Sequence, residues 1–142
     1  MNISPTSLGI KIGATGKIGP HLVRMACRAV QASGVSRRVY AVARSEMADL
    51  EKAGAVAIRC DVLDPESVAR LPRVRTVVFM VGFKFGAESA KSMTWAGNTI
   101  APYHVARHFQ GSRIVVYSTG CVYPVLSIRS GGATEDTPPE PV

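Results

Sequence analysis

The chain has 142 residues, which is the length of one domain with a hydrophobic core. Hydrophobic residues make up 46% and charged residues 19%, as in globular proteins, and no apolar run approaches the roughly 20 residues that cross a bilayer. The first seven residues lack the basic and apolar regions of a signal peptide, so we expect a soluble, cytoplasmic protein without a membrane partner. The net charge of +7 comes from scattered basic residues without aromatic interleaving, which argues against a specific nucleic-acid partner.

Cysteine and histidine patterns do not indicate a metal site. Cys27, Cys60 and Cys121 are too widely spaced for a disulfide framework or a metal knuckle, so we expect small, buried or half-buried thiols. His104 and His108 lie four residues apart on a predicted helix, which is a zinc-ligand spacing. The glutamate that follows the first histidine in metalloprotease helices is missing, so we predict no metal.

A glycine-rich turn stands between the first predicted strand, Leu8–Ile12, and a helical pattern over Ile18–Ser33. In a dinucleotide-binding turn, Gly13 permits the tight bend, Gly16 lets a pyrophosphate approach the backbone, and Gly19 lets helix and strand pack closely. The positive end of the helix dipole then faces the anion. The glycines alone are equally consistent with an ordinary turn, but the flanking strand and helix favour nucleotide binding.

A second strand over Arg38–Ala43 completes a β-α-β unit. The next residue meets the adenosine ribose in such units, where an acid suits NAD and an arginine suits NADP. Arg44 occupies this place, so the sequence favours NADP; the alternative is that Arg44 is only a solvated charge at the strand end. Ser45 is the expected N-cap of a short helix over Glu46–Lys52, which keeps Glu46 out of the site.

Ala55–Cys60 is the third predicted strand, and Asp61 and Val62 follow at its carboxyl end, where open α/β sheets bind their ligands. Asp64 is the expected cap of another helix, over residues 65–71, with a proline at its first position.

Val74–Val81 is the fourth predicted strand, with the β-branched composition of a central strand. Gly82 follows either as a point of close ligand approach or as a loop hinge. A long helix is expected over Glu88–Phe109, with a kink near Pro102, and a fifth strand over Arg113–Ser118.

This alternation predicts an α/β fold: a Rossmann-type doubly wound parallel sheet in three α/β/α layers, truncated after about the fifth strand. We assign residues 1–129 to an incomplete NAD(P)-binding Rossmann domain. Residues 130–142 are rich in glycine, proline and acids, and are expected to be a loop or tail leading to a missing C-terminal part.

Several separated motifs agree with one family pattern. They are the glycine turn over residues 13–19, the Asp61-Val62 pair, Asn98 in the long helix, the strand and its Ser/Thr-bearing end over residues 115–124, and the acidic, proline-containing stretch over residues 135–139. Together they resemble the N-terminal portion of an extended short-chain dehydrogenase/reductase, the NAD-dependent epimerase/dehydratase family. The resemblance covers essentially the whole chain.

The resemblance places the catalytic hydroxyl on Thr119, with Ser118 as the alternative; the competing interpretation is that Thr119 only caps the following turn. The family's Tyr-x-x-x-Lys motif is absent, and Tyr103, which has Arg107 four residues later, lies on the wrong helix. The chain therefore looks like a fragment that stops before its catalytic base, and we expect it to be inactive alone.

The resemblance implies the NAD(P)-binding portion of an epimerase, dehydratase or oxidoreductase that acts by hydride transfer on a sugar-like, alcohol or carbonyl substrate. The alternative is a non-catalytic dinucleotide-binding sensor or interaction module. The expected cofactor is NADP or NAD, with NADP favoured. The resemblance also allows a homodimer of the full-length protein. The candidate catalytic residues are Thr119 and Asn98, and the candidate cofactor-binding residues are Gly13, Thr15, Gly16, Lys17, Ile18, Gly19, Arg44, Asp61, Val62, Val81 and Gly82.

Overall fold

A computed structural model describes residues 7–83 and 89–140 of the chain. Its centre is a sheet of five parallel strands in the order β3-β2-β1-β4-β5, which confirms the Rossmann-type prediction. The strands are β1 (Ser7–Ile12), β2 (Arg38–Ala43), β3 (Val56–Arg59), β4 (Thr76–Phe79) and β5 (Arg113–Val116), and the helices are α1 (Gly19–Ser33), α2 (Ala48–Lys52), α3 (Pro65–Ala69), α4 (Lys91–Trp95) and α5 (Ala101–His108).

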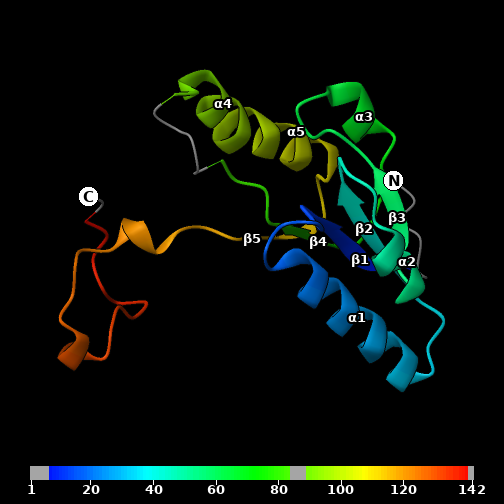
Figure 1. Ribbon diagram of the computed structural model, residues 1–142, viewed down its shortest axis with the longest axis horizontal. Helices are drawn as coiled ribbons and strands as arrows, with labels where there is room; N and C mark the ends of the chain where they lie inside the picture. Colours follow the sequence, from blue (N-terminus) through cyan, green and yellow to red (C-terminus); the bar gives the residue numbers. More distant parts are fainter. Residues whose placement is uncertain (1–6, 84–88, 141–142) are drawn as a thin grey trace.

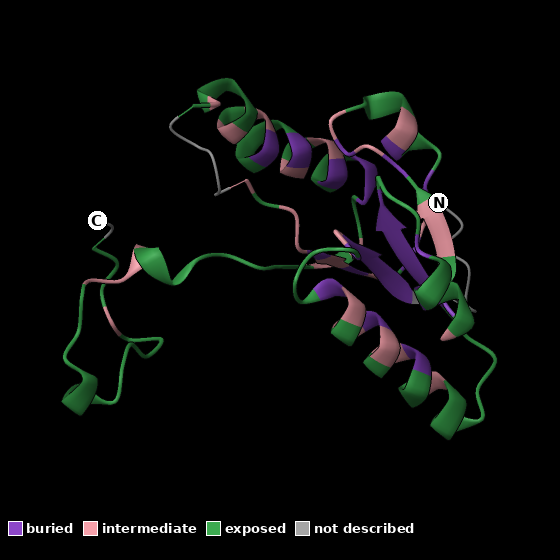
Figure 2. Ribbon diagram, viewed as in Figure 1, coloured by how far each residue is buried: buried purple, intermediate pink, exposed green. Residues whose placement is uncertain are grey.

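Helices cover both faces of the sheet (Figure 1), and each face has its own hydrophobic core. Alternate residues of a strand point to opposite faces, so Tyr40 and Val42 of β2 belong to the core under α3 and α5, while Ala41 between them belongs to the core under α1 and α2. Figure 2 shows the buried residues concentrated in the central strands and along the sheet-facing stripe of α1. Lys11 is also buried, with 6% of its surface exposed, and this burial lowers the pKa of its ammonium group.

The first helix begins at Gly19, one residue after the predicted start at Ile18, and ends at Ser33 as predicted. Pro20 lies in its first turn, where no backbone N–H is needed from it, and Gly34 caps its C-terminus at a left-handed φ of 64°. Asp64 caps α3 as expected, because its side chain accepts a hydrogen bond from the Glu66 N–H at 3.0 Å. Among residues 7–83 and 89–140, no helix has both the length and the apolar character needed to cross a membrane.

The predicted capping role of Ser45 is wrong. Helix α2 begins at Ala48, two residues later than expected, and Met47 precedes it without a side-chain cap. The Ser45 hydroxyl instead donates a hydrogen bond to the Thr15 hydroxyl, 3.2 Å away in the glycine-rich turn. Ser45 therefore connects two loops at the carboxyl ends of β1 and β2 rather than starting a helix.

The long helix predicted before the fifth strand is interrupted. It consists of α4, a π-helical turn over Ala96–Ile100, and α5, while its expected start at Glu88 lies outside the described residues. Pro102 explains the irregularity, because it has no N–H to donate to the Asn98 carbonyl four residues earlier. A π-helical turn is a common way to accommodate such a break.

Beyond β5 the chain leaves the sheet (Figure 1). It forms two short 3-10 helices, Gly120–Val122 and Ile128–Ser130, and the Glu140 N–H donates a hydrogen bond back to the Val122 carbonyl at 2.9 Å. Almost every residue of this segment is exposed (Figure 2). The expectation of a buried or half-buried thiol is therefore wrong for Cys121, whereas Cys27 and Cys60 are buried.

Candidate functional site

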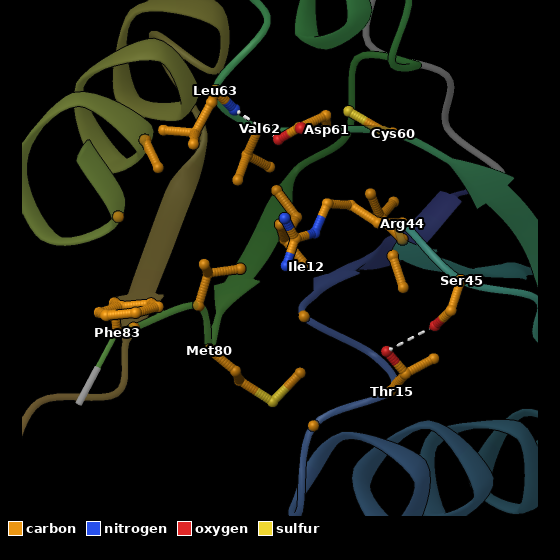
Figure 3. A pocket seen from close by; sticks show the side chains of 18 of the residues that line it. Ile12, Thr15, Arg44, Ser45, Cys60, Asp61, Val62, Leu63, Met80 and Phe83 are labelled. Atoms are coloured by element: carbon orange, nitrogen blue, oxygen red, sulfur yellow. Dashed lines mark hydrogen bonds between the residues drawn. The ribbon is translucent and has the colours of Figure 1, made fainter. Parts of the chain in front are cut away.

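A cavity of about 350 Å³ lies at the carboxyl ends of β1, β2, β3 and β4 (Figure 3), where open parallel sheets bind ligands. Loops from all four strands meet there because right-handed crossovers bring every strand end to the same edge. The sequence-predicted residues that line it are Gly13, Thr15, Gly16, Arg44, Asp61, Val62, Val81 and Gly82. The predicted residues Lys17, Ile18, Gly19, Asn98 and Thr119 do not line it.

The glycine-rich turn forms the floor of the cavity and is held by the neighbouring strand. The N–H groups of Gly13 and Ala14 donate to the Val42 carbonyl at 2.9 and 3.0 Å. Gly13 has a φ of 89°, a region that L side chains rarely adopt. Gly16 is different: it is exposed, and a Cβ built on it would meet only the Gly13 carbonyl oxygen, at 3.3 Å.

Gly19 packs the start of α1 against the glycine-rich turn. It is the first residue of α1 and is buried, and a Cβ built on it would lie 2.6 Å from the Gly13 carbonyl oxygen. The helix start therefore packs directly on the turn. This arrangement also points the N-terminal end of the 15-residue α1 towards the cavity floor.

Arg44 and Asp61 face the cavity from adjacent strand ends. The Arg44 side chain extends across it towards Ile12 (Figure 3). Asp61 accepts a hydrogen bond on Oδ1 from the Leu63 N–H at 3.0 Å, which holds the carboxylate against its own loop. That loop is tied to α5, because Nδ1 of His104 lies 3.2 Å from the Val62 carbonyl oxygen.

Phe83 lines the opposite wall and is held in place by Asn98. The Asn98 side chain accepts from the Phe83 N–H on Oδ1 at 2.8 Å and donates from Nδ2 to the Phe83 carbonyl at 2.9 Å. Gly97 allows this approach, since a Cβ there would come within 3.1 Å of the Phe83 Cβ. Asn98 thus positions the wall of the cavity without lining it.

Thr119 lies outside the cavity, on the exposed segment after β5. Its hydroxyl accepts a hydrogen bond from the Cys121 N–H at 3.2 Å and so caps the 3-10 helix that follows. Ser118, the alternative, is exposed on the same segment. The structure therefore brings eight of the eleven candidate cofactor residues to the cavity but does not place the candidate catalytic hydroxyl beside them.

Burial favours the neutral forms of two titratable groups, Cys60 in the cavity lining and His108 at the C-terminal end of α5. Burial raises the pKa of the Cys60 thiol, although a hydrogen bond from Ser67 counteracts this, so the thiol is protonated and is not a nucleophile. Burial also lowers the pKa of His108, whose Nε2 lies 2.9 Å from the Leu71 carbonyl oxygen. In the described part of the chain, no three His, Cys, Asp or Glu side chains come together as a metal site.

Sequence reasoning missed eleven residues of the lining, most of which are apolar. The residues it did not single out are Ile12, Val42, Ala43, Ser45, Cys60, Leu63, Met80, Phe83, Met93, Gly97 and Ala101. Most of them directly flank a predicted site residue at a strand end, so their position was a usable signal. Met93, Gly97 and Ala101 lie on the interrupted helix at intervals of four residues, so their common helix face was the signal that could have grouped them.

A family model described as NAD(P)H-binding matches residues 13–136. No curated protein matches the chain. Among solved structures, MoeE5 in complex with UDP-glucuronic acid and NAD is 26% identical, with a TM-score of 0.70, and the match covers 94% of this chain and 42% of MoeE5.

Two further structures share the fold. The UDP-glucose 4-epimerase of Thermus thermophilus in complex with NAD is 23% identical with a TM-score of 0.68, over 94% of this chain and 44% of the epimerase. The triphenylmethane reductase of Citrobacter sp. complexed with NADP(H) is 18% identical with a TM-score of 0.56, and the match covers 79% of this chain and 38% of the reductase. The chain spans less than half the length of these proteins. The family match over most of the chain, together with the cavity at the strand ends, shows that this chain belongs to the NAD(P)H-binding family, with epimerases and short-chain dehydrogenases/reductases as its structural neighbours.

Proposed function

We propose that the chain is the cofactor-binding part of an NAD(P)-dependent epimerase, dehydratase or reductase that acts by hydride transfer on a sugar-like, alcohol or carbonyl substrate. The observation that carries the proposal is the cavity itself, because a glycine turn, Arg44 and the Asp61-Val62 pair converge on it from separate strands. The nicotinamide cofactor would supply the hydride chemistry when bound.

The residues around the cavity suit the parts of such a cofactor. Gly16 leaves space for the pyrophosphate at the start of α1, where backbone N–H groups and the helix dipole favour an anion. Arg44 and Asp61 would contact the adenosine, and the loop from Val81 to Phe83 would contact the nicotinamide end. Lys17 and Ile18 would act from the exposed side of the turn.

Arg44 should make the chain prefer NADP(H) over NAD(H). Its guanidinium suits the 2′-phosphate, whereas an acid there would pair with the ribose hydroxyl and repel a phosphate. We expect Arg44→Asp to reverse the preference, with NADP(H) affinity falling roughly 100-fold while NAD(H) affinity changes little. Titration of both cofactors against wild type and variant tests this. Equal affinities in the wild type, or no reversal in the variant, would contradict the assignment.

Asn98 is proposed to act as a positioning residue for the nicotinamide end. We expect Asn98→Ala to lower cofactor affinity about fivefold, because Phe83 loses both hydrogen bonds that hold its backbone. Thr99→Ala is the matched control, since Thr99 is exposed on the same π-helical turn. Fluorescence titration with the reduced cofactor measures the difference. An Asn98→Ala protein that binds as well as the Thr99→Ala protein would rule out this role.

Thr119 is proposed to hydrogen-bond the substrate oxygen once the remaining substrate-binding residues are in place. By itself, the 142-residue chain is expected to show no turnover, because its sequence holds no Tyr-x-x-x-Lys and a threonine hydroxyl is a poor base near neutral pH. The absorbance of the reduced nicotinamide, followed with sugar and alcohol substrates, provides the measurement. Turnover that depends on Thr119 would require another proton-transfer group, and Tyr123 would be the first to test.

A further inference from the structure

A second, smaller cavity of about 310 Å³ opens beside the first at the ends of β2 and β3. Its lining residues are Arg44, Arg59, Cys60, Asp61 and Ser67. Arg44, Cys60 and Asp61 also line the larger cavity, so the two spaces adjoin at the place proposed for the adenosine. Arg59 and Ser67 line only the smaller cavity, and neither has a role in the proposed function.

Strand pairing brings the two arginines to the same edge of the sheet. In the parallel ladder of β2 and β3, Arg59 lies opposite Ala43, and the Cys60 N–H donates to the Ala43 carbonyl at 3.0 Å. Arg44 is the next residue after Ala43, so both arginines lie within one residue of the same rung. Ser67 approaches from α3, where its side chain hydrogen-bonds the Cys60 thiol.

The charges of this smaller cavity suit a dianion. Across residues 7–83 and 89–140 the structure holds one ion pair, Lys52–Asp49, so neither Arg44 nor Arg59 is neutralised by a carboxylate. The single acid in the lining, Asp61, directs Oδ1 to the N–H of its own loop. Two guanidinium groups therefore face one carboxylate, and planar guanidinium groups are well suited to phosphate oxygens.

We propose that Arg59 is a second specificity residue, which binds the 2′-phosphate of NADP together with Arg44, while the Ser67 hydroxyl exchanges its hydrogen bond to the Cys60 thiol for one to the phosphate. This inference rests on the proposed function, because it requires the adenosine of a dinucleotide to lie at the ends of β2 and β3. It adds phosphate contacts from Arg59 of β3 and Ser67 of α3 to the contact from Arg44, the residue after β2.

The test compares NADP⁺ with NAD⁺, which differ only in that phosphate, on the 142-residue chain. Isothermal titration of Arg59→Gln should give NADP⁺ affinity about tenfold weaker than wild type and NAD⁺ affinity within about twofold. Arg59→Lys should retain part of the NADP⁺ preference, since it keeps the charge but loses the planar donor pair. Arg38→Gln, an exposed arginine at the opposite end of β2, is the matched control and should leave both affinities unchanged. A thermal melt of each variant verifies folding.

The outcomes separate this inference from the proposed function. If Arg59→Gln keeps the full preference for NADP⁺, or weakens both cofactors equally, Arg59 does not bind the 2′-phosphate and the inference is wrong. If the wild type binds both cofactors equally, no phosphate site exists there, although dinucleotide binding itself stands. If the wild type binds neither cofactor, the proposed function fails and this inference fails with it.

Discussion

Replacing Gly16 with valine should abolish dinucleotide binding while leaving the fold intact. Gly16 is exposed on the cavity floor, and a Cβ there would meet only the Gly13 carbonyl oxygen, at 3.3 Å, so the free chain can accept a side chain if the turn shifts by a few tenths of an ångström. The two methyl groups of valine would instead fill the space that the pyrophosphate needs beside the start of α1. We expect an affinity loss of roughly 100-fold or more for both cofactors, which corresponds to about 2.8 kcal/mol.

Cofactor titration and thermal unfolding of the same Gly16→Val protein provide the measurement. Gly120→Val is a suitable control, because a Cβ built on Gly120 would meet no atom within 4 Å and Gly120 lies on the exposed segment beyond the sheet. That control should bind cofactor as the wild type does. Unchanged affinity in Gly16→Val would mean that the turn has only a structural role.

Replacing Gly19 with alanine should have the opposite effect and destabilise the fold itself. A single Cβ at this position would lie 2.6 Å from the Gly13 carbonyl oxygen, and the contacting atoms belong to backbone that cannot rotate away. Either α1 or the turn must shift, and overpacking of this kind costs about 3 kcal/mol. For a chain of this length, we expect a melting temperature lower by roughly 10 °C.

Chemical denaturation of Gly19→Ala beside Gly16→Ala measures this cost with one methyl group at each position. Gly16→Ala should unfold within about 0.5 kcal/mol of the wild type, because exposed substitutions away from strained backbone cost little. Equal stabilities of the two variants would show that the close approach of α1 to the turn is not needed for folding.

The fold could be predicted from the sequence because its signals are local. Apolar strand runs, Pro20 at a helix start, Gly34 at a helix end and Asp64 as a cap each depend on neighbouring residues only, and the structure places them as predicted. The meeting of Arg44, Asp61 and Val62 at one cavity was predictable for a related reason, since residues at the carboxyl ends of parallel strands must share one edge. The burial of Lys11 was not predictable in this way, because no local pattern in the sequence indicates that a lysine in the central strand is buried.

The features that the sequence did not reveal depend on contacts between distant residues. Ser45 has the residue type and position of a helix cap, but Thr15, 30 residues away in sequence, takes its hydrogen bond. Asn98 reaches Phe83 only because the π-helical turn and Gly97 bring the two segments together. The role of Thr119 stays a prediction, since its hydroxyl caps a turn on a segment that lies away from the cavity.

The two hydrophobic cores on opposite faces of the sheet have a consequence for the energetics of the molecule. The glycine turn packs with the core under α1, whereas the Asp61-Val62 loop is anchored through His104 to the core under α5. A dinucleotide that spans the cavity would bridge these two cores as a non-covalent crosslink. Because the dinucleotide binds only the folded chain, mass action then raises the free energy of unfolding by about 2.7 kcal/mol when the free dinucleotide is at 100 times its Kd. In a cell rich in nicotinamide cofactors, the folded population of this chain would thus follow the cofactor concentration.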